Sequence, residues 1–291
     1  MKGSLLALLL TMPLVACSNG NSGSQSSSKN YDNSISAFAY SDYVTPSFST
    51  SIGDYTGNPE HYINGEIYEL NLNSRYTLNL NAVDKNIDYD PKGCSFKYDK
   101  NNLEIIDCIF KEQSTHRLIY QLKPLKIVDN TKVEVYYYDS FCTSFNISIK
   151  DLSIDADSLA STSKNLNFTD PDFHDDITIF NDLETYESFM NKYHYFGYVK
   201  NSPNIETFKT YEYALIRIDH YSLGKDPEFN SVFIQNNVMY YDFISSKTYY
   251  EKAPDVIMWT NQDYYLSLIR YPNNYSVTNH IIWISHNYIP E

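Results

Sequence analysis

Polar and apolar residues alternate with a period of two through much of residues 35–150. In the segment YTLNLNA (residues 76–82) the leucines and the alanine share one face, and polar residues stand between them. The segments VEVYYY (133–138) and SFNISI (144–149) repeat this alternation. Successive side chains of a strand point to opposite faces, so these runs predict strands with one buried face. Several short strands separated by polar turns predict an antiparallel β-sandwich here.

The pattern changes in the last third of the chain. Four apolar residues recur at helical spacing, namely Tyr186, Phe189, Met190 and Tyr193. Asn181 followed by Glu184 fits a capping box, so we expect an amphipathic helix preceded by a short strand. Apolar runs then predict further strands, and QNN at 235–237 predicts the turn of a hairpin. For residues 177–291 we therefore expect a small α+β domain with one helix packed on an antiparallel sheet.

The stretch between these regions, residues 151–176, is rich in Ser, Asp and Asn and reads as an acidic linker. Its end carries a cluster of potential metal ligands, Asp170, Asp172, His174, Asp175 and Asp176. Carboxylate oxygens bind Ca²⁺, but the glycine and the terminal glutamate of an EF-hand loop are missing. We interpret the cluster as a solvated linker and expect no metal site.

The start of the chain is unlike the rest. A lysine at position 2 precedes an apolar run at residues 5–10, and Leu14, Val15 and Ala16 stand directly before Cys17. Residues 18–30 are almost entirely polar and cannot bury a core. The apolar run is too short to span a bilayer, which indicates an export signal.

These residues resemble the lipobox signal peptide of bacterial lipoproteins. The resemblance implies a signal peptide at residues 1–16, a lipid-modified Cys17 and a flexible tether over residues 17–34. Two acyl chains at about 0.8 kcal/mol per buried methylene anchor a protein stably, whereas one chain does not. The expected location is the extracytoplasmic face of the cell membrane, with the lipid as the membrane contact.

A second resemblance concerns residues 35–150. The segment SFKYDKNNLEIID reads as strand, turn and strand, and VEVYYY and FNISI follow it as a pair. This order is similar to that of bacterial immunoglobulin-like domains, which implies an immunoglobulin-like β-sandwich. The chain as a whole is expected to be mainly β.

Three cysteines follow Cys17. Cys94 shares its strand parity with Phe96, and Cys108 shares its parity with Ile106, so both are expected to point inward. A Cys94–Cys108 disulfide closing a loop of about 15 residues would stabilise the fold by about 3 kcal/mol, and two buried thiols are the alternative. Cys142 has the parity of polar residues and is expected to point outward.

Charge restricts the partners of the 291-residue chain. Lys plus Arg number 22 and Asp plus Glu number 36, a net charge of −14, which argues against binding to nucleic acid. The 29 tyrosines fit either a sugar-binding surface or a compositional bias of the genome. Trp259 and Trp283 either line a cleft or lie in a core.

No catalytic motif is recognised. Asp219 and His220 form an adjacent acid and base, which we interpret as surface residues, and we expect neither cofactor nor catalytic residues. The sequence thus favours a non-enzymatic surface lipoprotein that binds, adheres or holds an envelope complex, with a protein or carbohydrate partner outside the cell. The alternatives are a ligand-capturing lipoprotein of a transport system and a surface hydrolase whose site the sequence does not reveal.

Overall fold

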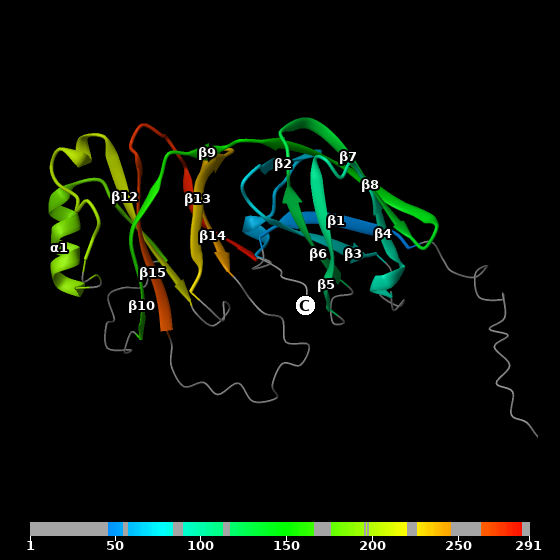
Figure 1. The fold of residues 1–291 in the computed structure, drawn as a ribbon, viewed down its shortest axis with the longest axis horizontal. Helices are drawn as coiled ribbons and strands as arrows, with labels where there is room; N and C mark the ends of the chain where they lie inside the picture. Colours follow the sequence, from blue (N-terminus) through cyan, green and yellow to red (C-terminus); the bar gives the residue numbers. More distant parts are fainter. Residues whose placement is uncertain are drawn as a thin grey trace, which may run out of the picture. The chain divides into compact units, whose positions relative to one another are not determined.

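Strands make up most of the described part of the chain, which is mainly β as predicted. The computed structural model describes residues 46–54, 58–83, 90–112, 117–165, 176–194, 196, 198–219, 226–245 and 263–286. These residues belong to one compact unit, Val44–Glu291. Two four-stranded sheets come from residues 48–150, here the N-terminal half, and two from residues 153–286, the C-terminal half (Figure 1). Within the described ranges, no helix has the length and apolarity needed to cross a membrane.

The N-terminal half consists of two sheets on either side of a shared apolar core. One sheet has the order β1-β3-β6-β5 and is antiparallel, and the other has the order β2-β8-β7-β4, with β2 parallel to β8. The strands are β1 (Phe48–Gly53), β2 (Ile67–Asn71), β3 (Tyr76–Ala82), β4 (Cys94–Lys97), β5 (Leu103–Glu112), β6 (Arg117–Pro124), β7 (Val128–Tyr137) and β8 (Ser140–Lys150). Leu78 and Leu80 of β3 meet Val133 of β7 and Ile147 of β8 in the core, which confirms the alternation seen in the sequence.

The C-terminal half also contains two facing sheets. Their orders are β10-β15-β12-β11, which is antiparallel, and β16-β14-β13-β9, in which β14 and β16 are parallel. The elements are β9 (Ser153–Ile154), β10 (Asp157–Asn165), β11 (Ile177–Phe180), α1 (Leu183–Tyr193), β12 (Tyr211–Asp219), β13 (Glu228–Gln235), β14 (Val238–Ser245), β15 (Asp263–Pro272) and β16 (Asn279–His286).

Both faces of the sheet β10-β15-β12-β11 are covered. Tyr213 and Leu215 of β12 pack with Tyr186 of α1, whereas Ala214 and Ile216 pack on the opposite sheet. The helix α1 thus covers one face of this sheet, and a second sheet, which the sequence did not predict, covers the other. A strand that is buried on both faces reads as a continuous apolar run, and such a run does not reveal how many layers cover it.

The assignment of residues 153–165 to a linker was wrong, and residues 166–175 lie outside the described residues. Residues 153–154 pair with β13, and residues 157–165 pair with β15 along an edge of their sheet. Leu159 is buried there, and Ser161 is exposed. Small polar residues suit the solvent side of an edge strand, and this is why the composition resembled that of a linker.

Local signals predicted α1 and the hairpin well. The helix begins one residue later than expected, because Asp182 and not Asn181 is the N-cap: its carboxylate accepts a hydrogen bond from the Thr185 amide at 2.7 Å. The predicted hairpin joins β13 and β14. Asn236 and Asn237 have φ values of 51° and 62°, as a two-residue type I′ turn requires.

Candidate functional site

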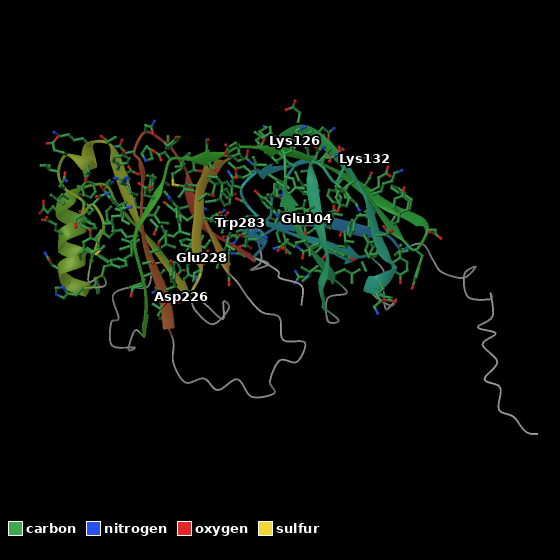
Figure 2. All side chains as sticks on the ribbon, viewed as in Figure 1. Glu104, Lys126, Lys132, Asp226, Glu228 and Trp283 are labelled. Atoms are coloured by element: carbon green, nitrogen blue, oxygen red, sulfur yellow. The ribbon has the colours of Figure 1, made fainter. Side chains whose placement is uncertain are left out.

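The outer face of the sheet β16-β14-β13-β9 packs against the N-terminal half. Phe233 of β13 and Trp283 of β16 belong to the core cluster of the N-terminal half, and Tyr240 of β14 packs against that cluster. Figure 2 labels Trp283 at the place where the two halves meet. We call this contact region the junction. Buried polar groups and a pocket occur together in this region.

Trp283 is the centre of the junction. Its side chain is fully buried, and its indole Nε1 donates to the carbonyl oxygen of Arg75 at 3.1 Å. The ring stands edge-on to Tyr76 and Tyr240, with centroid distances of 5.3 and 5.6 Å. Of the two interpretations left open by the sequence, the structure supports a core residue for Trp283. Trp259 lies outside the described residues.

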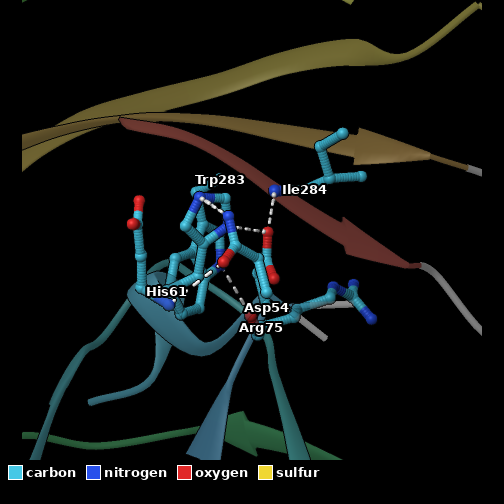
Figure 3. A network of polar contacts seen from close by, with 7 residues as sticks. Asp54, His61, Arg75, Trp283 and Ile284 are labelled. Atoms are coloured by element: carbon cyan, nitrogen blue, oxygen red, sulfur yellow. Dashed lines mark hydrogen bonds and ion pairs between the residues drawn. The ribbon is translucent and has the colours of Figure 1, made fainter. Parts of the chain in front are cut away.

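A buried carboxylate connects the two halves beside this ring (Figure 3). Asp54 follows β1 and is 1% exposed, and its Oδ2 accepts from His61 Nδ1 at 2.8 Å. His61 ends a short 3₁₀ helix, Pro59–His61. The backbone amide of Ile284, on β16, approaches the same oxygen at 3.5 Å. Asp54 thus receives donors from both halves of the chain.

A second buried carboxylate lies on β14. Asp242 has no exposed surface and accepts from Asn230 Nδ2 at 2.7 Å and from Ser285 Oγ at 3.2 Å. Burial raises the pKa of Asp242 to about 6, against the opposing effect of its hydrogen bonds and of the nearby Arg75. Asn230 sits at a β-bulge and also donates to the carbonyl of Asn73 in the N-terminal half at 2.9 Å.

Further directed hydrogen bonds fix the orientation of the halves. The side chain of Gln235 donates to the carbonyl of Glu69 at 2.9 Å. The side-chain oxygen of Asn71 accepts from the amide of Leu152, in the connection between the halves, at 3.0 Å. Hydrogen bonds have narrow geometric limits, so these contacts restrict the orientation of the two halves.

A pocket of about 370 Å³ opens beside the junction. Its polar wall comes from Asn73, Ser74 and Arg75, in the turn before β3, together with Lys123 of β6 and Asn230 of β13. Its apolar wall contains Leu72, Leu125 and Ile244. A larger groove lies along α1 and is lined by Asp182, Glu184, Glu187, Ile205 and Phe208 among others. In the described part of the chain, no group of His, Cys, Asp and Glu is arranged to hold a metal ion.

Most residues that the sequence suggested as sites are not among the described residues. Cys17, the cluster from Asp170 to Asp175, and His220 lie outside the described residues, as does the side chain of Asp219. Asp176 is described, and it forms an ion pair with Arg217 at 2.9 Å.

The structure tests the predictions for two of the three cysteines of the N-terminal half. Cys94 is half-buried against the core, as its parity predicts, but the side chain of Cys108 is outside the described set, so the disulfide stays a prediction. Cys142 is also half-buried against the core and does not point outward as expected. The pairing of β7 and β8 shifts between Val135 and Tyr136, opposite Cys142, and this bulge breaks the alternation on which the prediction rested.

No sequence motif singled out Asp54, Asp242 or Arg75. One signal was available for Asp242: it is the only charged residue in the run VMYYDFI, which is apolar at both parities. Such a run is typical of a strand that is buried on both faces, so a carboxylate within it needs partners. Arg75 and Asp54 carry no comparable local signal, because their contacts with Trp283 and Ile284 join residues more than 200 positions apart.

Comparisons with known proteins add no family. No family model matches the sequence, and no curated protein shows significant similarity to it. Among solved structures, the S-layer protein rSbsC(31-844) is 9% identical with a TM-score of 0.27, and the match covers 47% of this chain and 19% of that chain. Domains 4–9 of the surface layer protein SbsC are 6% identical with a TM-score of 0.27, covering 83% of this chain and 32% of that chain. The chain thus corresponds to less than a third of either structure, and similarity at this level carries no argument about fold or function.

Proposed function

We propose that this protein is a lipid-anchored module on the extracytoplasmic face of the cell membrane that binds a partner and catalyses no reaction. The observation that carries the proposal is the sequence Leu14-Val15-Ala16-Cys17, followed by a polar tract and then by a β-rich folded unit. A thiol at this position accepts the lipid, the tract separates the fold from the membrane, and the sheets offer a stable surface.

An immunoglobulin-like fold for the N-terminal half is part of this proposal. Constant-type immunoglobulin domains place their first, second, fifth and fourth strands in one sheet and the third, sixth and seventh in the other. The order β1-β3-β6-β5 and the order β8-β7-β4 follow this scheme if β2 is taken as an extra edge strand. Immunoglobulin-like sandwiches commonly serve as surface-exposed modules, which supports a binding role.

The junction favours a fixed module over a ligand-capturing protein that closes by a hinge. Hinge closure requires an interface that separates at low cost. Here Trp283 is buried between the halves, and separation would take the Ile284 amide away from the buried Asp54 and the carbonyl of Asn73 away from Asn230. The halves are therefore expected to move as one body when a partner binds.

Membrane fractionation of a Cys17→Ser variant tests the anchor. The native protein should sediment with membranes and resist a carbonate wash, and its intact mass should include a diacylglyceryl group on residue 17. Cys17→Ser should appear in the soluble fraction. The matched control, Cys142→Ser, removes a half-buried thiol and should stay with the membrane. A Cys17→Ser protein that remains membrane-bound, or a native protein with an unmodified cysteine, would contradict the proposal.

A further inference from the structure

Arg75 is a half-buried cation in the wall of the junction pocket. Its backbone carbonyl is fixed by the indole of Trp283, and its guanidinium extends away from Asp54 and His61 (Figure 3). Among the described residues, no side chain forms a hydrogen bond or ion pair with this guanidinium. Glu104 and Asp242 act on it only at longer range. Arg75 lines the pocket, and within the described ranges its five N–H donors have no direct acceptor.

Burial of a guanidinium in this arrangement is energetically costly. Removal of water from the guanidinium lowers the pKa of Arg75, and the opposing effect of Glu104 and Asp242 is smaller. Arginine nonetheless stays charged, because its ordinary pKa is far above neutrality. A desolvated guanidinium without a partner gains most from a planar anion that accepts two of its N–H groups at once.

The rest of the pocket restricts the anion to one negative charge. Lys123 supplies a second cation, but Glu104 lies 3.4 Å from its ammonium group and offsets it. The buried Asp242 beside Asn230 adds further negative potential at the junction. A phosphate-like dianion would meet this potential, whereas a carboxylate has the lower charge and the planar shape that a guanidinium prefers.

The opposite wall of the pocket calls for an apolar group on the ligand. Leu72 and Ile244 are partly buried there, and Leu125 is 43% exposed at the edge. A volume of about 370 Å³ lies at the small end of the range for ligand pockets. It suits a group of the size of a leucine derivative.

We propose that the junction pocket binds an aliphatic carboxylate, with the Arg75 guanidinium as its principal contact and the apolar wall receiving the aliphatic group. Two kinds of ligand carry such a carboxylate: a peptide whose C-terminal residue is aliphatic, and a free branched short-chain acid. The inference deepens the proposed binding role and does not depend on whether Cys17 carries a lipid.

Isothermal titration calorimetry on the full-length chain in detergent tests this site with three probes: N-acetyl-leucine, isovalerate and N-acetyl-leucinamide. N-acetyl-leucine should bind about 10-fold more tightly than its amide, because one charge-assisted contact is worth roughly that factor. Binding of N-acetyl-leucine over isovalerate identifies the peptide terminus as the source, and the reverse order identifies the free acid. Glucuronate, a carboxylate without an aliphatic group, should bind weakly.

Arg75→Gln should weaken binding of the carboxylate probes about 10-fold and leave the affinity for the amide unchanged. Lys97→Gln is the matched control: its side chain is 79% exposed on β4, and binding should stay at the native level. Thermal unfolding checks that each variant folds. If Arg75→Gln does not fold, Lys123→Gln serves as the second variant, and it should weaken binding of the carboxylate probes several-fold.

Equal affinity for N-acetyl-leucine and its amide would overturn the inference, as would absence of binding by every carboxylate probe or native affinity in the folded Arg75→Gln protein. These outcomes are separate from those of the fractionation experiment. A protein that binds isovalerate but is never lipidated contradicts the proposed anchor alone, and a lipidated protein that binds no probe contradicts the pocket assignment alone.

Discussion

Replacing Asp242 by Asn removes the buried charge of the junction while keeping the shape of the side chain. The amide oxygen of the new residue can still accept from Asn230, and its amino group can donate to Ser285 Oγ, since a hydroxyl rotates to suit either role. The substitution therefore isolates the cost of ionising a carboxyl group in this position.

The expected effect depends on pH, and its sign follows from the raised pKa. Asp242 has a pKa of about 6 in the folded protein, against an ordinary value of 3.8. Between these values the folded state holds a proton that the unfolded state has released, so stability falls as the pH rises through this window. The gap between about 6 and 3.8 corresponds to about 3 kcal/mol of unfolding free energy, because each pKa unit is worth about 1.4 kcal/mol. Asp242→Asn cannot ionise and lacks this decline.

Urea unfolding monitored by tryptophan fluorescence measures the difference directly. At about pH 4 the free energies of unfolding of the variant and the native protein should differ by a small amount. By about pH 7 the free energy of unfolding of the variant should have risen by about 3 kcal/mol relative to that of the native protein. Asp129→Asn, at an exposed position on β7, is the control for removal of a surface carboxylate. If the difference in free energy of unfolding between Asp242→Asn and the native protein stays constant from pH 4 to pH 7, the ionisation of Asp242 does not destabilise the fold and the reasoning fails.

Two further substitutions test the junction from other sides. Trp283→Leu removes the buried indole and its hydrogen bond to Arg75. Chemical denaturation should show that it lowers the free energy of unfolding by about 3 kcal/mol. Tyr198→Leu, at a 79% exposed side chain, should have little effect. A loss for Trp283→Leu no larger than that for Tyr198→Leu would contradict the central packing role. Gly53→Ala places a Cβ 2.5 Å from the ring of Tyr62, so this ring must shift, which lowers the free energy of unfolding by about 1 to 3 kcal/mol. Ser49→Ala, exposed on the same strand, serves as its comparison, and equal midpoints in urea would show that the ring moves aside freely.

Local patterns predicted local structure in this chain. The alternation in YTLNLNA identified β3 and its buried face, the spacing of Tyr186, Phe189, Met190 and Tyr193 identified α1, and the two asparagines after Gln235 identified a type I′ turn. Each of these features depends on residues within about one helical turn or one hairpin, so a short stretch of sequence contains the necessary information.

Features that depend on distant partners were not predictable in this way. The parallel pairing of β14 with β16 joins strands separated by the whole of β15, and the residues of β10 resemble a linker because their partner strand is more than 100 positions away. The bulge opposite Cys142 shifts the alternation of buried and exposed side chains, and no nearby glycine or proline indicates it in the sequence. The junction pocket combines residues from four separate segments, so its donors became apparent only when these segments were brought together.

The shared core at the junction has a practical consequence for truncation. A fragment that ends at residue 150 would keep every strand of its two sheets, yet Phe233 and Trp283 would no longer close the end of its hydrophobic cluster. The exposed rings of Tyr76 and its neighbours would then face water, favouring aggregation over clean folding. Production of this protein in pieces is better served by leaving both sandwiches on one polypeptide, because the apparent boundary in the sequence passes through a continuous interior.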